Sequence, residues 1–373
     1  MRTIQIVNVR WFNATAWYGL WLAKLLNNAG HETRVFTLPD TPNWDKAREF
    51  GFDPEFLPFN SKNPLTFPGL YYKLRRAVKN FKPDIINCHR GEGFILCALL
   101  REELGNFGLI RTRGDQRPPK ANLPNLLLHK YTADEIIATN SRTATHFIDQ
   151  MRVPASKVHT ILGGVDTAKF RFSEEGRKAV RNEFGFKDSD FVVGLLGRYD
   201  EVKGHRDLLQ AAARLRKFEH QGDLKILFVG HPTPHFSQER LHAYAEEAGV
   251  ADIVRYTGRR NDVEACISAF DAGVVASLWS EAIARAALEI MACGRPLVST
   301  TVGVMPDLLP VAAMYPPGNV GELARLILTL KNNIQFKKDL LRHQEANMQS
   351  LSPGCFLNST LAVYEAALAR LKK

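Results

Sequence analysis

The chain has 373 residues, of which 45% are hydrophobic and 24% charged, and its formal net charge is +10. This length exceeds what a single hydrophobic core usually reaches, so we expect two domains. The balanced composition excludes a mainly disordered, collagen-like or disulfide-scaffold protein. No apolar run approaches the roughly 18 residues of a membrane span, and the first residues read as a strand rather than a signal peptide, so we expect a cytoplasmic protein.

Short apolar runs alternate with segments of helical period throughout residues 1–165. This alternation is typical of a parallel sheet with crossover helices, and it predicts a doubly wound, Rossmann-like α/β domain. The predicted strands are Ile4–Val9, Glu32–Thr37, Asp84–Cys88, Gly108–Thr112, Glu135–Thr139 and Val158–Leu162. The predicted helices are Tyr18–Ala29, Leu70–Phe81, Gly93–Leu104 and Arg142–Met151.

Residues 166–350 repeat this alternation, and we take the polar stretch from Asp166 to Asp190 as the domain boundary. The predicted strands are Phe191–Leu196, Lys225–Val229, Ile253–Tyr256, Ala272–Ala276 and Leu297–Thr300. The predicted helices are Arg206–Phe218, Gln238–Ala248, Asp262–Ala269 and Ala282–Ala292. Residues 351–373 should form a last helix that packs back on the body of the protein, toward the first domain. Because ligands bind at the carboxyl ends of strands in such sheets, we expect a site in a cleft between the two domains.

Several common kinds of site are excluded. The turn after the first strand lacks the glycines of a GxGxxG dinucleotide site, and no GxxxxGK[ST] phosphate loop occurs. The five cysteines show no CxxC spacing, which indicates buried reduced thiols and no metal cluster. The acidic pattern Asp188-Ser-Asp190 lies in a polar turn before a strand, so we interpret it as turn chemistry and predict no metal site.

Two carboxylates, Glu281 and Glu289, lie eight positions apart in the segment from Ser280 to Gly294. On one continuous helix this spacing would place them on a broad shared face, roughly 12 Å apart along the axis, where they could hold two ends of one ligand. Glu281 falls at a strand-to-helix junction, where unpaired backbone N–H groups suit an anionic ligand. From spacing alone, an acid near a helix start and a second, solvated acid are an equally good interpretation.

Two cations, Arg198 and Lys203, come from one loop that follows the strand Phe191–Leu196. Fixed cations beside flexible glycine backbone can grip a diphosphate. The alternative is an ordinary loop whose charged side chains face water.

Taken together and in their order, these segments resemble the retaining glycosyltransferases of family 4, which have the two-domain GT-B fold. The resemblance extends along most of the chain, and it implies that residues 1–165 form the acceptor-side domain and residues 166–350 the nucleotide-sugar-binding domain. Gly194–Gly204 resembles the family's diphosphate loop, Tyr256–Arg259 its base-side strand end and Ser280–Gly294 its double-glutamate motif. Ala133–Ser141 resembles a strand of its first domain and Leu162–Phe170 its hinge segment. Met291–Pro296 followed by Thr301–Gly303 is also typical of the family.

The resemblance implies transfer of a sugar from a nucleotide-diphosphate sugar to an acceptor hydroxyl with retained anomeric configuration, without a cofactor. Arg198 and Lys203 would neutralise the departing diphosphate, an interaction that strengthens as charge develops there. Glu281 would accept hydrogen bonds from the donor sugar and Glu289 from the ribose. The resemblance also places backbone N–H groups beside the sugar and phosphate, and two residues near the nucleotide base: Ala282, Ile283 and Ala284, and Gly258 and Arg259.

The sequence departs from the family pattern at three positions of the expected substrate sites: Thr15, Arg113 and Ala282. Thr15 and its alanine neighbours stand where family members usually have a glycine pair near the donor phosphates. Arg113 stands where a first-domain histidine is common; it cannot act as a general base, but it can hold a phosphate or carboxylate of the acceptor. His89 is the remaining nearby histidine, for which a structural role is at least as good an interpretation. Ala282 follows Glu281 where a glycine is frequent.

The positive charge is concentrated in residues 1–165, which carry 22 basic and 14 acidic side chains. The basic helix Leu70–Phe81 and the residues Arg111, Arg113, Arg117 and Lys120 favour an anionic or membrane-associated acceptor, such as a lipopolysaccharide-core or other cell-envelope glycan precursor. Peripheral contact with an anionic membrane face is part of this hypothesis. The alternative is that the apolar stripe of that helix simply faces the core.

Two other functions fit the same architecture. A nucleotide-sugar 2-epimerase would change the donor sugar without an acceptor, and a nucleotide-sugar-binding protein would bind the donor without turnover. Nucleic-acid binding is not expected, because the sequence contains no recognised module for it.

Overall fold

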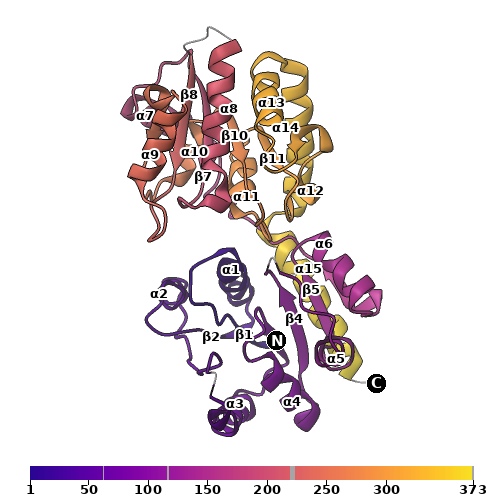
Figure 1. Cartoon of the computed structure of the whole chain (residues 1–373). Coiled ribbons are helices and arrows are strands. Elements are labelled where there is room, and N and C mark those ends of the chain that lie inside the picture. Colours follow the sequence, from indigo (N-terminus) through magenta and orange to yellow (C-terminus); the bar gives the residue numbers. More distant parts are fainter. Residues whose placement is uncertain (62, 116, 219–222, 372–373) are drawn as a thin grey trace. The chain divides into compact units, whose positions relative to one another are not determined.

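The computed structural model describes residues 1–61, 63–115, 117–218 and 223–371 (Figure 1). The chain divides into two compact units. The N-terminal unit contains Met1–Gly164 and the C-terminal segment that begins at Pro353, and the C-terminal unit contains Val165–Ser352. Each unit has one parallel sheet of six strands covered by helices, so the predicted α/β class is confirmed.

The sheet of the N-terminal unit has the strand order β2-β1-β3-β4-β5-β6. Its strands are β1 (Arg2–Ile6), β2 (Glu32–Phe36), β3 (Ile85–Cys88), β4 (Gly108–Arg113), β5 (Glu135–Ala138) and β6 (Val158–Thr160). All six lie within or close to the predicted runs, and every neighbouring pair is parallel. The order places β1 and β3 side by side, although about eighty residues separate them in the sequence.

The helices of the N-terminal unit are α1 (Ala14–Asn28), α2 (Pro42–Glu49), α3 (Phe67–Phe81), α4 (Phe94–Leu104), α5 (Leu123–Leu127) and α6 (Ser141–Thr145). The predicted helix Arg142–Met151 forms as α6 and a following π-helical segment, His146–Gln150. The apolar stripe of α3, including Leu74 and Val78, is buried in the core. The core-facing interpretation of that stripe is therefore confirmed.

The sheet of the C-terminal unit has the order β12-β11-β10-β7-β8-β9. Its strands are β7 (Phe191–Leu196), β8 (Leu224–Val229), β9 (Val254–Tyr256), β10 (Ala272–Val275), β11 (Leu297–Thr300) and β12 (Met314–Tyr315). Its helices are α7 (Glu174–Glu183), the short 3₁₀ helix η5 (Glu201–Lys203), α8 (His205–Phe218), α9 (Gln238–Glu247), α10 (Val263–Ser268), α11 (Arg285–Ala292), α12 (Met305–Leu308), α13 (Val320–Asn332) and α14 (Ile334–Ser350).

The stretch from Asp166 to Asp190, predicted to be a boundary, contains helix α7 and belongs to the C-terminal unit. Arg177 and Arg181 of α7 form ion pairs with Asp271 at 2.7 and 2.6 Å. Two charged side chains of this stretch thus anchor helix α7, through a partner that lies about ninety residues further along the chain.

Helix α15 (Pro353–Leu371) packs on the N-terminal unit, although it ends the chain. Buried Tyr364 accepts hydrogen bonds from Asn87 of β3 at 2.9 Å and from Gln5 of β1 at 3.2 Å. Ala367 lies against Gly108, where an added Cβ would come within 3.1 Å of the alanine side chain. The predicted packing of the last helix on the body of the protein is confirmed.

Four cysteines are buried, as predicted, but Cys355 on α15 is exposed. None of the helices in the described residues is long and apolar enough to cross a membrane.

Candidate active site

Lys203 and Glu281 meet where β7 and β10 of the C-terminal unit end. The Lys203 ammonium contacts Oε1 of Glu281. The loop before α8 and the segment after β10 approach each other through their backbones, since Leu278 N donates to Val202 O at 2.8 Å. Gly204 makes this approach possible, because its φ is +67° and an added Cβ would lie 2.0 Å from Ala276 O.

The Glu281 carboxylate is held from several directions. Ser277 donates a hydrogen bond to its Oε1, and Thr300 at the end of β11 donates to Ser277 O at 2.7 Å. The backbone of Glu281 is fixed as well, because Val304 N donates to its carbonyl at 2.8 Å. Gly303 leaves room for that carbonyl: an added Cβ there would lie 1.9 Å from it. The side chain is therefore buried and oriented at the junction, as a ligand-binding acid would be.

Glu281 and Glu289 do not share one helix, which corrects the geometry expected from their spacing. Helix α11 begins only at Arg285, and Ala284 before it has a left-handed φ of 50°. Ile283 and Ala284 are buried, whereas Ala282 is half-buried. The chain therefore turns between the two acids.

Glu289 lies on α11 and is buried, with an exposed fraction of 5%. Arg285, one turn earlier on the helix, donates from Nε to Glu289 Oε1 at 2.6 Å. Burial raises the pKa of the Glu289 carboxyl, while the Arg285 guanidinium works in the opposite direction. The carboxylate thus has a cationic neighbour that the sequence analysis did not consider.

Arg198 extends from the same loop as Lys203, but its guanidinium is exposed and pairs with Asp200 at 2.7 Å. Gly258 and exposed Arg259 follow β9, and Gly258 has a φ of +67°. Of the four charged side chains expected to bind the donor, the structure brings Lys203 and Glu281 into contact, and it pairs Arg198 and Glu289 with other residues.

Three predicted site residues belong to the N-terminal unit. Thr15, in the first turn of α1, donates to Gly114 O at 2.9 Å and is buried. Arg113, at the end of β4, pairs with Asp115 at 3.1 Å. His89 is fully buried and donates from Nε2 to Gln5 Oε1 at 2.9 Å. Burial, followed by the nearby Arg111, lowers the pKa of His89 to about 3, so its ring is neutral and its environment fits the structural interpretation.

Arg111 is also buried, which corrects its expected place on a basic surface. It is 1% exposed and donates from Nη1 to Cys88 O at 2.7 Å. Burial lowers the pKa of its guanidinium to about 10. Arg117 and Lys120 are exposed, as expected.

The acidic pattern at 188–190 forms a turn, as interpreted from the sequence. Asp190 accepts a hydrogen bond from Lys187 N at 2.7 Å and closes the turn before β7. Within the described part of the chain, no three His, Cys, Asp or Glu side chains come together in a way that could hold a metal ion.

Two residues of the candidate site were missed in the sequence. Ser277 lies just after β10, and a hydroxyl at the carboxyl end of a parallel strand is a signal that could have identified it. Arg285 lies four positions before Glu289, and this spacing predicts a side-chain pair on a helix. The predicted helix Ala282–Ala292 already contains both residues, so this second signal was present in the sequence.

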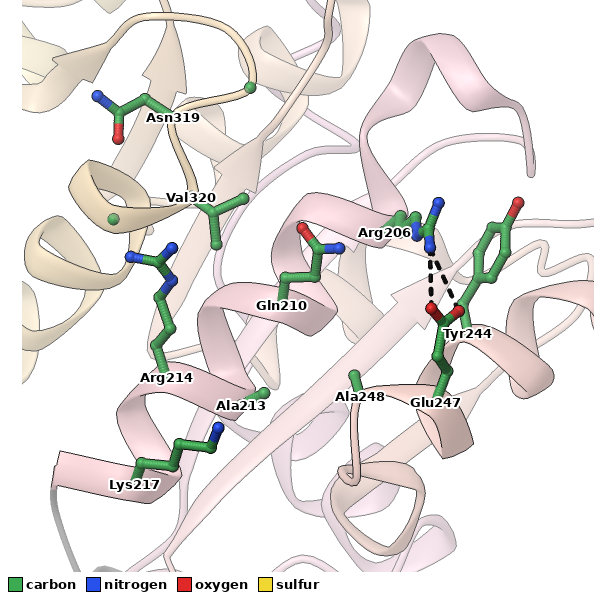
Figure 2. A pocket seen from close by; sticks show the side chains of 12 residues that line it. Arg206, Gln210, Ala213, Arg214, Lys217, Tyr244, Glu247, Ala248, Asn319 and Val320 are labelled. Carbon is green, nitrogen blue, oxygen red and sulfur yellow. Dashed lines mark hydrogen bonds and ion pairs between the residues drawn. The ribbon is translucent and has the colours of Figure 1, made fainter.

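A separate groove of about 770 Å³ lies on the C-terminal unit between α8, α9 and the loop before α13 (Figure 2). Figure 2 shows Arg206 of α8 pointing to Glu247 of α9, with which it pairs at 3.0 Å. None of the predicted site residues lines this groove.

Two family models match the chain. The model described as glycosyl transferases group 1 matches residues 190–333, and the one described as glycosyltransferase family 4 matches residues 18–169. Together they cover most of both units.

Named relatives and solved structures agree with these models. A D-inositol 3-phosphate glycosyltransferase 2 of Catenulispora acidiphila is 31% identical over 51% of this chain and 45% of its own length. The chain thus spans about half the length of this curated relative. The crystal structure of Anabaena Alr3699/HepE in complex with UDP has a TM-score of 0.85 at 19% identity, covering 98% of this chain and 100% of that one.

The lipopolysaccharide outer core galactosyltransferase WaaB, in its apo form, has a TM-score of 0.74 at 16% identity, covering 97% of this chain and 99% of that one. These structural likenesses concern the fold. With the two family models and the two six-stranded parallel sheets, they show that the chain belongs to the group 1, family 4 glycosyltransferases and has the GT-B fold.

Proposed function

We propose that the protein transfers a sugar from a nucleotide-diphosphate sugar to an acceptor hydroxyl and retains the anomeric configuration. The observation that carries this proposal is the contact between Lys203 and Glu281, held by close backbone approaches at the carboxyl ends of β7 and β10. A cation and an acid at this point can bind the two halves of such a donor, since one suits a phosphate and the other a sugar hydroxyl.

In this proposal the donor separates the Lys203–Glu281 pair. The ammonium turns to the diphosphate, joined by exposed Arg198 from the same loop, and the carboxylate accepts hydrogen bonds from the donor sugar. Negative charge grows on the departing diphosphate in the transition state, so the two cations bind that state more tightly than the ground state. They supply the charge neutralisation without a metal, and chelation by EDTA should leave the activity unchanged.

The rest of the donor lies along the same unit. Glu289 binds the ribose hydroxyls in place of its contact with Arg285, and Gly258 and Arg259 lie beside the nucleotide base. Backbone N–H groups at the turn before α11 face the sugar and phosphate, at Ala282, Ile283 and Ala284.

The transfer needs no protein base. In a same-face reaction the bond between the anomeric carbon and the phosphate oxygen breaks, the bond to the acceptor oxygen forms, and the acceptor proton passes to the departing phosphate oxygen. Buried His89 and permanently charged Arg113 are both unsuited to removing that proton, which supports this route.

We further propose that the product belongs to a cell-envelope glycan, of which lipopolysaccharide is one example. Support comes from the GT-B fold shared with the lipopolysaccharide outer core galactosyltransferase WaaB, and from the fold shared with an Anabaena protein that was solved with UDP. These likenesses make a nucleoside diphosphate the first ligand to test.

Peripheral membrane contact is a separate proposal. The apolar stripe of α3 is buried, so binding would rest on its exposed cations Lys73, Arg76 and Lys79. Sedimentation with phosphatidylglycerol vesicles should fall as salt rises and be lost in the triple alanine variant, because each surface cation contributes about 1 kcal/mol. The control changes Lys338 and Arg342, which are exposed on α14. Equal binding to phosphatidylcholine vesicles would contradict the proposal.

The decisive experiment is a thermal-shift panel of nucleoside diphosphates and nucleotide sugars. A ligand at 100 times its dissociation constant adds about 2.7 kcal/mol of stability. Glu289→Ala should weaken binding of the diphosphate itself, whereas Glu281→Ala should weaken only the sugar-bearing donor. No stabilisation by any nucleoside diphosphate would sink the proposed function.

Product analysis distinguishes the remaining possibilities for a donor that binds. Nuclear magnetic resonance of the product should show the donor's anomeric configuration in a new glycosidic bond. A changed sugar without an acceptor would indicate an epimerase, and binding with neither transfer nor donor hydrolysis would indicate a binding protein.

A further inference from the structure

The groove of about 770 Å³ between α8, α9 and the loop before α13 has the volume of a small-molecule pocket (Figure 2). One face of α8 forms a wall of it, because Arg206, Gln210 and Arg214 follow each other at intervals of four residues. None of the residues proposed to bind the donor lines this groove. A molecule bound here would therefore occupy a site of its own.

The two arginines on this face of α8 differ in their partners. Arg206 is neutralised, because its guanidinium pairs with Glu247 of α9 at 3.0 Å. Arg216, which lies outside the groove, pairs with Asp252 at 2.6 Å. Among the described residues, no carboxylate pairs with Arg214. The wall contains more cations than carboxylates, and its uncompensated positive charge lies at the Arg214 end.

The loop before α13 positions Arg214 at the groove. An added Cβ at Gly321 would lie 3.2 Å from Arg214 Nη1, so the guanidinium lies close to a backbone that has no side chain at this point. The following residue, Glu322, does not neutralise it, because Glu322 pairs with Arg325 at 2.8 Å. Figure 2 shows Arg214 extending toward Val320. A guanidinium carries several N–H donors in one plane, which match the oxygens of a phosphate group.

The part of α8 between the two arginines presents uncharged side chains to the groove. Gln210 lies midway, and its exposed amide has both donors and acceptors for a hydroxyl group. Ala213 leaves room beside it. Arg206 and Arg214 are eight residues apart, about 12 Å along the helix axis, which is enough for one sugar ring that carries a phosphate. Further negative charge on the ligand would lie near Glu247, where like charges repel.

We propose that this groove is a second ligand site and binds a sugar phosphate, a monoester with one phosphate group. Arg214 binds the phosphate, and Gln210 binds a hydroxyl group of the sugar. The single phosphate distinguishes this ligand from nucleic acids and acidic peptides, whose additional charges would meet Glu247. The site goes beyond the proposed function and does not depend on it, because the two sets of residues are different.

The test is isothermal titration calorimetry with the full chain. The probes are the 6-phosphates of glucose, galactose and mannose, with inorganic phosphate and methyl glucoside for comparison. At least one hexose phosphate should bind in a 1:1 complex and more tightly than either comparison compound. Its affinity should fall as salt rises, because the charges lie at the surface.

Arg214→Ala should weaken binding of the hexose phosphate about ten- to a hundredfold, the range for hydrogen bonds to a charged group, and Arg214→Lys should restore part of it. Gln210→Ala should weaken the hexose phosphate roughly three- to tenfold and leave inorganic phosphate unchanged. Equal loss for both ligands in Gln210→Ala would contradict the place given to the sugar.

Arg216→Ala is the matched control, because Arg216 is an exposed arginine of the same helix outside the groove wall. It should leave binding unchanged. Three results would each overturn the proposal: equal affinity in Arg214→Ala and the unchanged protein, no binding of any hexose phosphate, or tighter binding of a glutamate hexapeptide than of every hexose phosphate.

Titration of Lys203→Ala separates this groove from the proposed donor site. The hexose phosphate should keep its affinity in this variant, because Lys203 does not line the groove. Lost affinity in Lys203→Ala together with full affinity in Arg214→Ala would place the ligand at the donor site and overturn the proposal. A lack of stabilisation by nucleoside diphosphates would contradict the proposed function alone.

Discussion

The two units present their strand ends in different ways. In the C-terminal unit, Gly204 and Gly303 bring backbones so close that a Cβ at either position would lie 2.0 or 1.9 Å from a carbonyl oxygen, and the Lys203–Glu281 pair is fixed there. In the N-terminal unit, the ends of β1 and β3 leave a hollow of about 530 Å³ whose wall includes exposed Trp11. Under the proposed function, the fixed site binds the diphosphate, a group that is the same in every such donor.

The largest effect is expected at Lys203. In the proposed reaction, Lys203→Ala removes a cation from the position where charge develops on the diphosphate, and such losses lower the turnover number about 10²- to 10³-fold. Donor turnover should be measured as released nucleoside diphosphate, with and without an acceptor.

Lys217→Ala is the matched control, since Lys217 is an exposed lysine of α8 in the same unit. It should keep full turnover. If Lys203→Ala and Lys217→Ala have equal turnover, the reaction does not depend on a fixed cation at Lys203. The close backbone approaches around Lys203 would then have no role in catalysis.

A second prediction concerns the close backbone approach itself. Gly303→Ala combines a left-handed φ of +63° with a Cβ in the place of the Glu281 carbonyl, so the free energy of unfolding should fall by about 2–4 kcal/mol. Gly294 has the same φ of +63° and no atom within 4 Å of an added Cβ, so Gly294→Ala should cost only about 1–2 kcal/mol. Denaturant unfolding measures the loss of stability in both variants. Equal losses would mean that the backbone at residue 303 does not approach the Glu281 carbonyl closely.

A third prediction uses α15, which ties the end of the chain to the N-terminal unit. Tyr364→Phe removes the acceptor of two buried amide groups, on Gln5 and Asn87, and should destabilise that unit by about 1–2 kcal/mol. Hydrogen exchange should quicken in β1 and β3 and stay unchanged in β7 and β10. Tyr72→Phe, at an exposed position, is the control, and equal acceleration in both sheets would show that the units do not respond separately.

Much of the fold could be predicted from the sequence, because local pattern determines it. The strand Phe191–Leu196 is an uninterrupted apolar run, and its predicted bounds agree with the structure. Helix α7 within the polar stretch was not predicted, because Arg177 and Arg181 are anchored by Asp271, a partner that no local pattern reveals.

The site was less predictable, because its geometry depends on backbone conformation and distant contacts. Glu281 and Glu289 have helical spacing, yet the left-handed Ala284 ends any continuous helix between them. Arg111 reads as a surface cation, yet it lies inside the sheet's core. The hollow beside Trp11 combines three segments that are far apart in the sequence, so composition and spacing could not indicate it.

The smallest predicted effect is the pH dependence of Glu289. Burial raises the pKa of this carboxyl in the folded protein above its ordinary value of 4.5, so the folded state binds the proton more tightly than the unfolded state. The free energy of unfolding should therefore fall as pH rises from the ordinary pKa through the raised one, by about 1.4 kcal/mol for each tenfold difference in proton affinity. Glu289→Gln removes this fall, so its stability relative to the unchanged protein should increase over that interval. Parallel curves of unfolding free energy against pH for the unchanged protein and Glu289→Gln would contradict this prediction. They would mean that the contact with Arg285 fully offsets the effect of burial on the Glu289 carboxylate. Burying this second acid in the C-terminal unit would then cost no more stability than exposing it on the surface.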